Sequence, residues 1–223
     1  MPPRVFRVGK KPDAWARKPP TRGLLRPTNR YDDPLGVYQT IYVASSAYGA
    51  FMETMADLRP APQLKLASVV LENEPTLRST PPPGQITSWI EGRHLGEASL
   101  CGEFVDLASS ASLAYLRHRM SRCFEKYEIA DFDLSTLVSS KREITQEISR
   151  LIFELAFREK RRFAGICYPS RLGHNITCWA IFDEDGTACI VEKKSAPVDL
   201  TDHELLRAFT DSRISLGRAE AAS

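Results

Sequence analysis

One stretch of sequence decides how the chain is organised: Thr40-Ile41-Tyr42-Val43-Ala44-Ser45-Ser46-Ala47-Tyr48-Gly49-Ala50-Phe51-Met52-Glu53. Residues 41–44 are β-branched, aromatic or small and predict a strand. Ser45 or Ser46 is a suitable N-cap for a helix over residues 47–58. The core face of that helix has helical spacing, at Ala47, Phe51, Met55 and Leu58. Glu53 lies off this face, beside small residues that leave room for a ligand and that equally suit a solvent-facing helix.

Short strands and helices follow one another on both sides of this stretch, without a repeating βαβ pattern. Residues 9–29, rich in Pro, Lys, Arg and Gly, predict a long loop. Strands are predicted over residues 5–8, 64–71, 85–90 and 161–168, and a hairpin over 176–182 and 188–193, turning at Glu184-Asp185-Gly186. Helices are predicted over residues 109–127, 139–160 and 199–209, the last capped by Thr201 or Asp202. This order predicts an α+β fold with short mixed or antiparallel sheets and surrounding helices.

Length and composition favour one domain. The 223 residues predict a single domain over 1–223, with a core over about 4–183 and a C-terminal strand, short helix and tail over 184–223. GxGxxG and Walker A motifs are absent from the sequence, which argues against Rossmann and P-loop domains. The five cysteines show no CxxC spacing, so neither a disulfide framework nor a zinc site is expected.

The charge and hydropathy of the chain limit where the protein is expected to be located and what it is expected to bind. The net charge of +2 does not demand nucleic acid as a partner. Residues 1–30 are nevertheless strongly basic, which suits either a disordered arm or a surface for an anionic ligand. The N-terminus has no apolar signal region and no run approaches 18 apolar residues. We therefore expect a cytoplasmic protein with no membrane segment and no direct binding to nucleic acid.

Five short motifs, taken together in this order and spacing, resemble the RES domain family, which is named for an Arg, a Glu and a Ser. The resemblance covers roughly residues 4–183. Each motif is weak alone. They are Val5-Phe6-Arg7-Val8, Asn29-Arg30-Tyr31-Asp32, Thr40-Ile41-Tyr42-Val43-Ala44-Ser45, Ala50-Phe51-Met52-Glu53 and Gly165-Ile166-Cys167-Tyr168-Pro169-Ser170-Arg171.

The resemblance implies a fold related to ADP-ribosyltransferases and an enzyme that consumes NAD+, usually as the toxin of a bacterial toxin–antitoxin pair. It implies a cognate antitoxin with a helix-turn-helix domain, and homodimerisation is an option. NAD+ is the substrate, inorganic phosphate is a candidate co-substrate, and no cofactor or metal is implied. The implied catalytic residues are Glu53, Arg30 and Ser170, and the implied binding residues are Arg7, Arg30, Tyr31, Tyr42, Glu53 and Ser170.

Physical chemistry gives each of these residues a role to weigh against an ordinary structural one. Arg7 and Arg30 suit charge-assisted hydrogen bonds to the pyrophosphate, or surface ion pairs. Tyr42, and more loosely Tyr31, suits stacking on the nicotinamide, or a place in the core. A carboxylate at position 53 stabilises the oxocarbenium-like charge that develops on the ribose, or is simply exposed.

The serine and the reaction itself are left with open alternatives. Ser170 suits a hydrogen bond to the nicotinamide amide or the ribose, or a turn-stabilising role, and its context is not that of a nucleophile. Cleavage of the nicotinamide–ribose bond by phosphate or by water is the first reading. Transfer of ADP-ribose to a protein uses the same site. A non-catalytic module that binds nucleic acid or an acidic protein through the basic N-terminal segment belongs to a different class.

Overall fold

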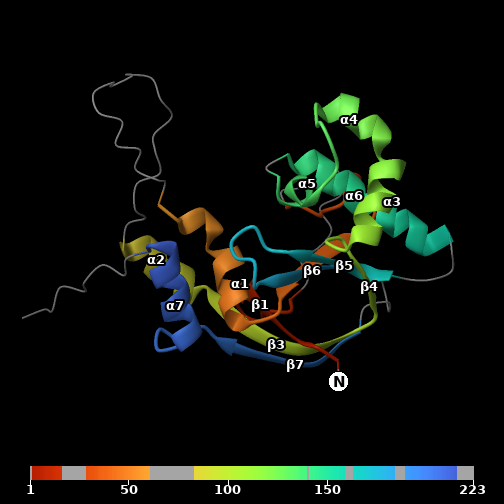
Figure 1. Ribbon diagram of the computed structural model, residues 1–223. Helices are drawn as coiled ribbons and strands as arrows, with labels where there is room; N and C mark the ends of the chain where they lie inside the picture. The colour runs from red at the N-terminus through yellow and green to blue at the C-terminus, as the bar shows by residue number, and fades with distance from the viewer. Residues whose placement is uncertain are drawn as a thin grey trace, which may run out of the picture.

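A mixed seven-stranded sheet runs through the protein, as the computed structural model shows (Figure 1). The structure describes residues 2–16, 29–60, 83–139, 141–158, 163–183 and 189–214. The strand order is β4-β5-β6-β2-β1-β3-β7, and of the neighbouring pairs only β4 and β5 are parallel. The strands are β1 (Arg4–Lys10), β2 (Gln39–Ala44), β3 (Arg93–Cys101), β4 (Glu103–Asp106), β5 (Phe163–Pro169), β6 (Thr177–Asp183) and β7 (Cys189–Pro197).

Helices form two groups along the sheet. Figure 1 shows α1, α2 and α7 gathered near β1 and β3, while α3, α4, α5 and α6 gather near β4, β5 and β6. The helices are α1 (Ala47–Thr54), α2 (Pro83–Glu91), α3 (Ser110–Arg119), α4 (Ser121–Tyr127), α5 (Leu134–Val138), α6 (Arg142–Arg158) and α7 (His203–Ser212), with a 3-10 turn at Ala56–Leu58. A mixed sheet with segregated helices is an α+β fold, which confirms the predicted class.

Side chains alternate along each strand and so form two separate cores. On one face, residues such as Ala44 and Phe182 pack against the helices in the larger core. On the other face, Val43 and Ile181 pack in a smaller core with Trp15. Since Trp15 is 7% exposed, part of the basic N-terminal segment belongs to the fold. Residues 17–28 of the predicted loop lie outside the described residues.

Strand β3 lies next to β1 and was not predicted from the sequence. Its Gly96 interrupts the apolar alternation for a steric reason. A Cβ atom at this position would lie 2.7 Å from the indole of Trp15. The indole Nε1 donates a hydrogen bond to the Lys194 carbonyl at 2.8 Å, so the ring spans β3 and its neighbour β7.

The hairpin predicted over 176–182 and 188–193 is wrong, although both strands exist. Both edges of β6 are already occupied, because β2 pairs along one and β5 along the other. Strand β7 instead pairs antiparallel with β3 at the end of the sheet. Alternation identifies strands, but it does not identify their partners.

Residues 85–90 form part of helix α2 and not the predicted strand. Pro83 is the first residue of this helix, a position where its missing N–H is tolerated. Ile86 and Ile90 lie one turn apart and are 0% and 5% exposed, which anchors the helix to the larger core. The strand predicted over 64–71 and the tail predicted over 217–223 lie outside the described residues.

The remaining helices form close to their predicted ranges. The predicted helix 47–58 is α1 followed by the 3-10 turn, and Ser46 is its N-cap. The helix predicted over 109–127 is interrupted at Met120, which separates α3 from α4. Asp202 caps α7, because its carboxylate accepts the backbone N–H groups of Glu204 and Leu205.

Candidate active site

Glu53 and Ser170 meet in space although they are 117 positions apart in the sequence. Glu53 projects from α1, and Ser170 follows the last residue of β5. The Ser170 hydroxyl donates a hydrogen bond to Glu53 Oε1 at 2.5 Å. Helix α1 therefore brings its carboxylate to the end of β5, next to the edge strand of the sheet.

The turn after β5 holds Ser170 in place from two sides. Its backbone N–H donates to the Ile176 carbonyl at 2.9 Å. Its hydroxyl oxygen accepts the Leu172 N–H at 2.9 Å. The single hydroxyl proton therefore goes to Glu53, which makes Ser170 a donor to a carboxylate and not an activated nucleophile.

Arg30 reaches the C-terminal end of the short helix α5. Its Nη1 donates to the Leu137 carbonyl at 2.6 Å and its Nη2 to the Val138 carbonyl at 3.3 Å. Carbonyl groups at a helix C-terminus attract a cation, so this contact is electrostatically favourable. The two bonds fix the plane of a guanidinium that has five N–H groups.

Helix α6 holds the segment that carries Arg30. Ser149 is fully buried, and its hydroxyl donates to the Tyr31 carbonyl at 2.8 Å. Gln146 Nε2 donates to the Asn29 carbonyl at 3.0 Å. Sequence reasoning missed both positioning residues. The available signal was a set of polar residues on the core side of an otherwise apolar helix face, at Thr145, Gln146 and Ser149.

Tyr42 ties this same segment to strand β2. Its hydroxyl donates to Asp32 Oδ1 at 2.9 Å and accepts the Tyr31 N–H at 3.0 Å. The ring of Tyr31 is 0% exposed and packs on the ring of Tyr168, with centroids 4.5 Å apart. Tyr31 is therefore a core residue in this structure, and the stacking role suggested for Tyr42 stays a prediction.

Two buried tyrosines and a buried thiol interact with the charge of Glu53, and two of these three groups also interact with that of Arg30. Burial raises the pKa values of Tyr31, Tyr168 and Cys178, and the Glu53 carboxylate raises all three further. The charge of Arg30 lowers the pKa values of Tyr31 and Cys178. Both charges therefore act on one cluster, in which the two phenols and the thiol stay protonated.

Arg7 is not brought to this cluster. On β1, its neighbours Phe6 and Val8 pack with the larger core, where Tyr42 also packs. Because side chains alternate, Arg7 lies on the opposite face with Val5, a residue of the smaller core. The structure therefore joins Glu53 to Ser170 and Tyr42 to the segment of Arg30 and Tyr31, and it places Arg7 on the other face of β1 from the larger core.

A cavity of about 300 Å³ lies elsewhere, beside the start of α7, and residues of β3 and β7 contribute to its lining. Its lining contains none of the residues predicted for the site. Within the described ranges, His, Cys, Asp and Glu side chains form no group of three that is placed to hold a metal ion. None of the helices in the described part of the chain is both long and apolar enough to cross a bilayer.

Comparison with known proteins identifies the family of the chain. The family model described as the RES domain matches residues 4–202, so the protein belongs to the RES domain family. Among solved structures, the crystal structure of the M. tuberculosis MbcT–MbcA toxin–antitoxin complex is similar, with a TM-score of 0.46 and 10% sequence identity. That match covers 96% of this chain and 89% of the other. A search of curated protein sequences gave no match.

Proposed function

We propose that this protein is a toxin-type enzyme that cleaves the nicotinamide–ribose bond of NAD+. The observation that carries the proposal is the hydrogen bond from Ser170 to Glu53, a carboxylate that acts on the same buried Tyr31 and Cys178 as the charge of Arg30. Membership of the RES domain family supports it. The motifs around Arg30, Glu53 and Ser170 resemble those of the three residues that name the family.

The proposed reaction needs a fixed carboxylate more than a strong acid. The bond between C1′ of the ribose and the nicotinamide nitrogen breaks, and its electron pair neutralises the charged ring. Nicotinamide leaves as a neutral molecule, while positive charge develops on the ribose. The Glu53 carboxylate stabilises that charge, and the hydrogen bond from Ser170 holds the carboxylate in one orientation before the substrate binds.

Arg30 supplies the complementary anion site in this proposal. Two of its N–H groups bind carbonyls of α5, and a guanidinium has five, so further donors suit the pyrophosphate of NAD+. The hydrogen bonds from α6 to the Asn29 and Tyr31 carbonyls fix the backbone around it. Binding energy from the pyrophosphate then places the ribose near Glu53.

The acceptor at C1′ divides the proposal into three reactions. Attack by water gives ADP-ribose, and attack by inorganic phosphate gives ADP-ribose 1-phosphate, each with loss of a proton. Attack by a protein side chain gives an ADP-ribosylated protein. All three use the same glutamate and release nicotinamide.

The test is NAD+ turnover by purified protein with and without inorganic phosphate, with products separated by chromatography. Loss of NAD+ only with phosphate identifies a phosphorylase. Loss without phosphate identifies a glycohydrolase, and a labelled protein band identifies a transferase. Intact NAD+ in all conditions, from protein shown to carry no bound partner, contradicts the proposal.

The toxin role adds a partner and a location to the proposal. An antitoxin with a helix-turn-helix domain is expected to bind the toxin and suppress its activity in the cytoplasm, and homodimerisation of the free toxin is an option. Expression of the wild-type chain in bacteria is expected to stop growth, and expression of Glu53→Gln is not. Equal growth with both would remove the toxin role.

A further inference from the structure

Helix α1, which carries Glu53, contacts other elements through two adjacent faces. Tyr48 and Met52 lie one turn apart and face α7, while Gly49 and Glu53 lie one turn apart and face the turn after β5. Successive residues of a helix are 100° apart, so these two faces are neighbours. A shift of α1 at the first face is therefore passed on to the second.

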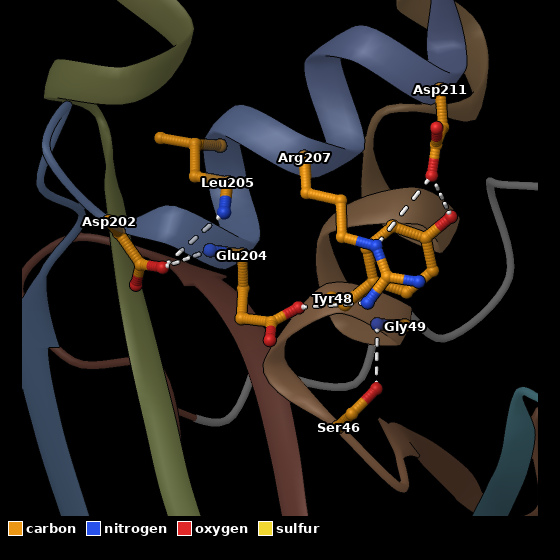
Figure 2. Close-up of polar contacts among 8 residues, drawn as sticks. All are labelled: Ser46, Tyr48, Gly49, Asp202, Glu204, Leu205, Arg207 and Asp211. Carbon is orange, nitrogen blue, oxygen red and sulfur yellow. Dashed lines mark hydrogen bonds and ion pairs between the residues drawn. The ribbon is translucent and has the colours of Figure 1, made fainter.

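The contact with α7 is a polar cluster, shown in Figure 2. The Tyr48 hydroxyl donates to Asp211 Oδ2 at 2.7 Å. The Arg207 guanidinium lies over the Tyr48 ring, 4.4 Å from its centroid, a cation–π contact. Arg207 also lies 3.9 Å from the carboxylates of Glu204 and Asp211.

Arg207 is the centre of this cluster. Glu204 Oε2 is buried and accepts no hydrogen bond among the described residues. The positive charge of Arg207 therefore compensates for the burial of this carboxylate oxygen. The same guanidinium orients Tyr48 and Asp211 toward each other. Beside them the Ser212 hydroxyl contacts the Met52 sulfur at 3.4 Å, within the buried part of the interface.

On its other face, α1 is in close contact with the turn that holds Ser170. A Cβ atom at Gly49 would lie 2.8 Å from Cγ2 of Ile176, whose carbonyl accepts the Ser170 N–H. There is little space between helix and turn, so α1 cannot move toward the turn. Contact with α7 limits movement away from it.

A helix of this length depends on such contacts. The eight residues of α1 are fewer than an isolated helix needs to be stable in water. Its position is therefore set by packing and by the groups at its ends. The apolar face of α7, with Leu205, Ala208 and Phe209 almost fully buried, provides a rigid surface for this purpose.

We propose that α7 positions Glu53 through α1, with Tyr48, Arg207 and Asp211 as positioning residues that touch no substrate. This deepens the proposed function and rests on it for the role of Glu53. The consequence is that residues on the surface of α7 control the rate of the reaction, although they lie outside the site.

The experiment uses the full chain labelled with [methyl-¹³C]methionine. Met52 and Met55 report on α1, and Met120 at the junction of α3 and α4 is the internal reference. Arg207→Ala is compared with Arg117→Ala, which removes a similarly exposed arginine from its ion pair with Asp131 on the other side of the molecule.

The expected result is specific to Arg207. Arg207→Ala shifts the Met52 methyl signal and leaves that of Met120 unchanged. It lowers kcat for NAD+ about 3- to 10-fold with KM unchanged, because the carboxylate is displaced and not removed. Arg207→Lys, which keeps a cation over the ring, recovers part of the rate. Arg117→Ala changes neither the Met52 methyl signal nor kcat.

Three results would overturn the proposal: an unchanged Met52 signal, an unchanged kcat, or a loss of rate as large in Arg117→Ala. Failure of the proposed function is distinguishable. If the wild-type protein leaves NAD+ intact, the catalytic role of Glu53 fails. The Met52 signal alone then decides whether α7 positions α1: a shift supports it and an unchanged signal overturns it.

Discussion

Gly49→Ala tests the close contact between α1 and the Ser170 turn. The added Cβ would lie 2.8 Å from Ile176 Cγ2 and 3.2 Å from Ala44 Cβ. Ordinary contacts begin at 3.4 Å, so relief of the closer clash needs 3.4 − 2.8 = 0.6 Å of movement. Glu53 is on the same short helix and moves with it.

Two opposing effects set the change in stability. Alanine in a helix interior is favoured over glycine by about 1 kcal/mol. Overpacking in a closely packed region costs about 1–3 kcal/mol. The sum predicts a free energy of unfolding that is unchanged or lower by up to about 2 kcal/mol. A displacement of this size at a catalytic group predicts a loss of activity on the order of tenfold, since about 1 Å costs about 100-fold.

Gly84→Ala is the matched control, because Gly84 is also helical, in α2, and has no atom within 4 Å of an added Cβ. Urea denaturation is expected to show Gly84→Ala stabilised by up to about 1 kcal/mol, with full NAD+ turnover. The difference in stability between the two variants is then about 1–3 kcal/mol. If Gly49→Ala is as stable and as active as Gly84→Ala, the contact argument is refuted.

Other predictions concern the supports of the site. Ser149→Ala leaves the Tyr31 carbonyl and the Tyr38 hydroxyl without their buried partner, so urea denaturation should show a loss of about 1–3 kcal/mol; an unchanged midpoint contradicts this. Tyr42→Phe keeps the ring but removes the two hydrogen bonds to the Arg30 segment, so kcat should fall while any stacking on nicotinamide persists. Full activity of this variant would show that the Tyr42 hydroxyl has no role in catalysis. Burial, with help from Glu147, raises the pKa of the Cys123 thiol to about 12. The unfolded thiol has a pKa of about 8.5, so this contribution to stability is complete below pH 8.5 and is lost as the pH rises toward 12. Denaturation at pH 8 and pH 10 should therefore show a smaller loss in Cys123→Ala than in wild type, and equal losses would contradict it.

Local structure around the site was predictable because its signals are local. The strand over residues 41–44 and the helix after Ser46 follow from β-branched residues, an N-cap and an apolar stripe. Glu53 was singled out because it falls off that stripe. The expectation that Glu53 and Ser170 share one site came from the family resemblance and not from periodicity, since nothing local joins residues so far apart, and their direct contact was not predicted.

Errors arose where the fold depends on distant partners. Strand β7 follows β6 in the sequence, yet it pairs with β3, because the edges of β6 are occupied by β2 and β5. Residues 85–90 alternate weakly and were read as a strand, although Ile86 and Ile90 are one helical turn apart. Short apolar runs suit either structure, and tertiary packing decides between them.

The position of Arg7 shows the same limit for the site. That Arg7 binds phosphate stays a prediction, but the face on which it lies depends on the register between β1 and its neighbours. Phe6 is opposite Ala44 on β2, which directs Phe6 to the larger core and Arg7 to the other face. Register of this kind is set by pairing across the sheet, which the motif itself does not encode.

The most direct test of the account is nicotinamide release from NAD+ by Glu53→Gln compared with wild type. Glutamine keeps the shape of the side chain and still accepts the hydrogen bond from Ser170, but it removes the negative charge. Glu154→Gln, which removes a carboxylate from an exposed ion pair on α6, is the control. The account predicts a fall on the order of 100- to 1,000-fold for Glu53→Gln, with the folded state retained and the control fully active. A Glu53→Gln rate within twofold of wild type would contradict it.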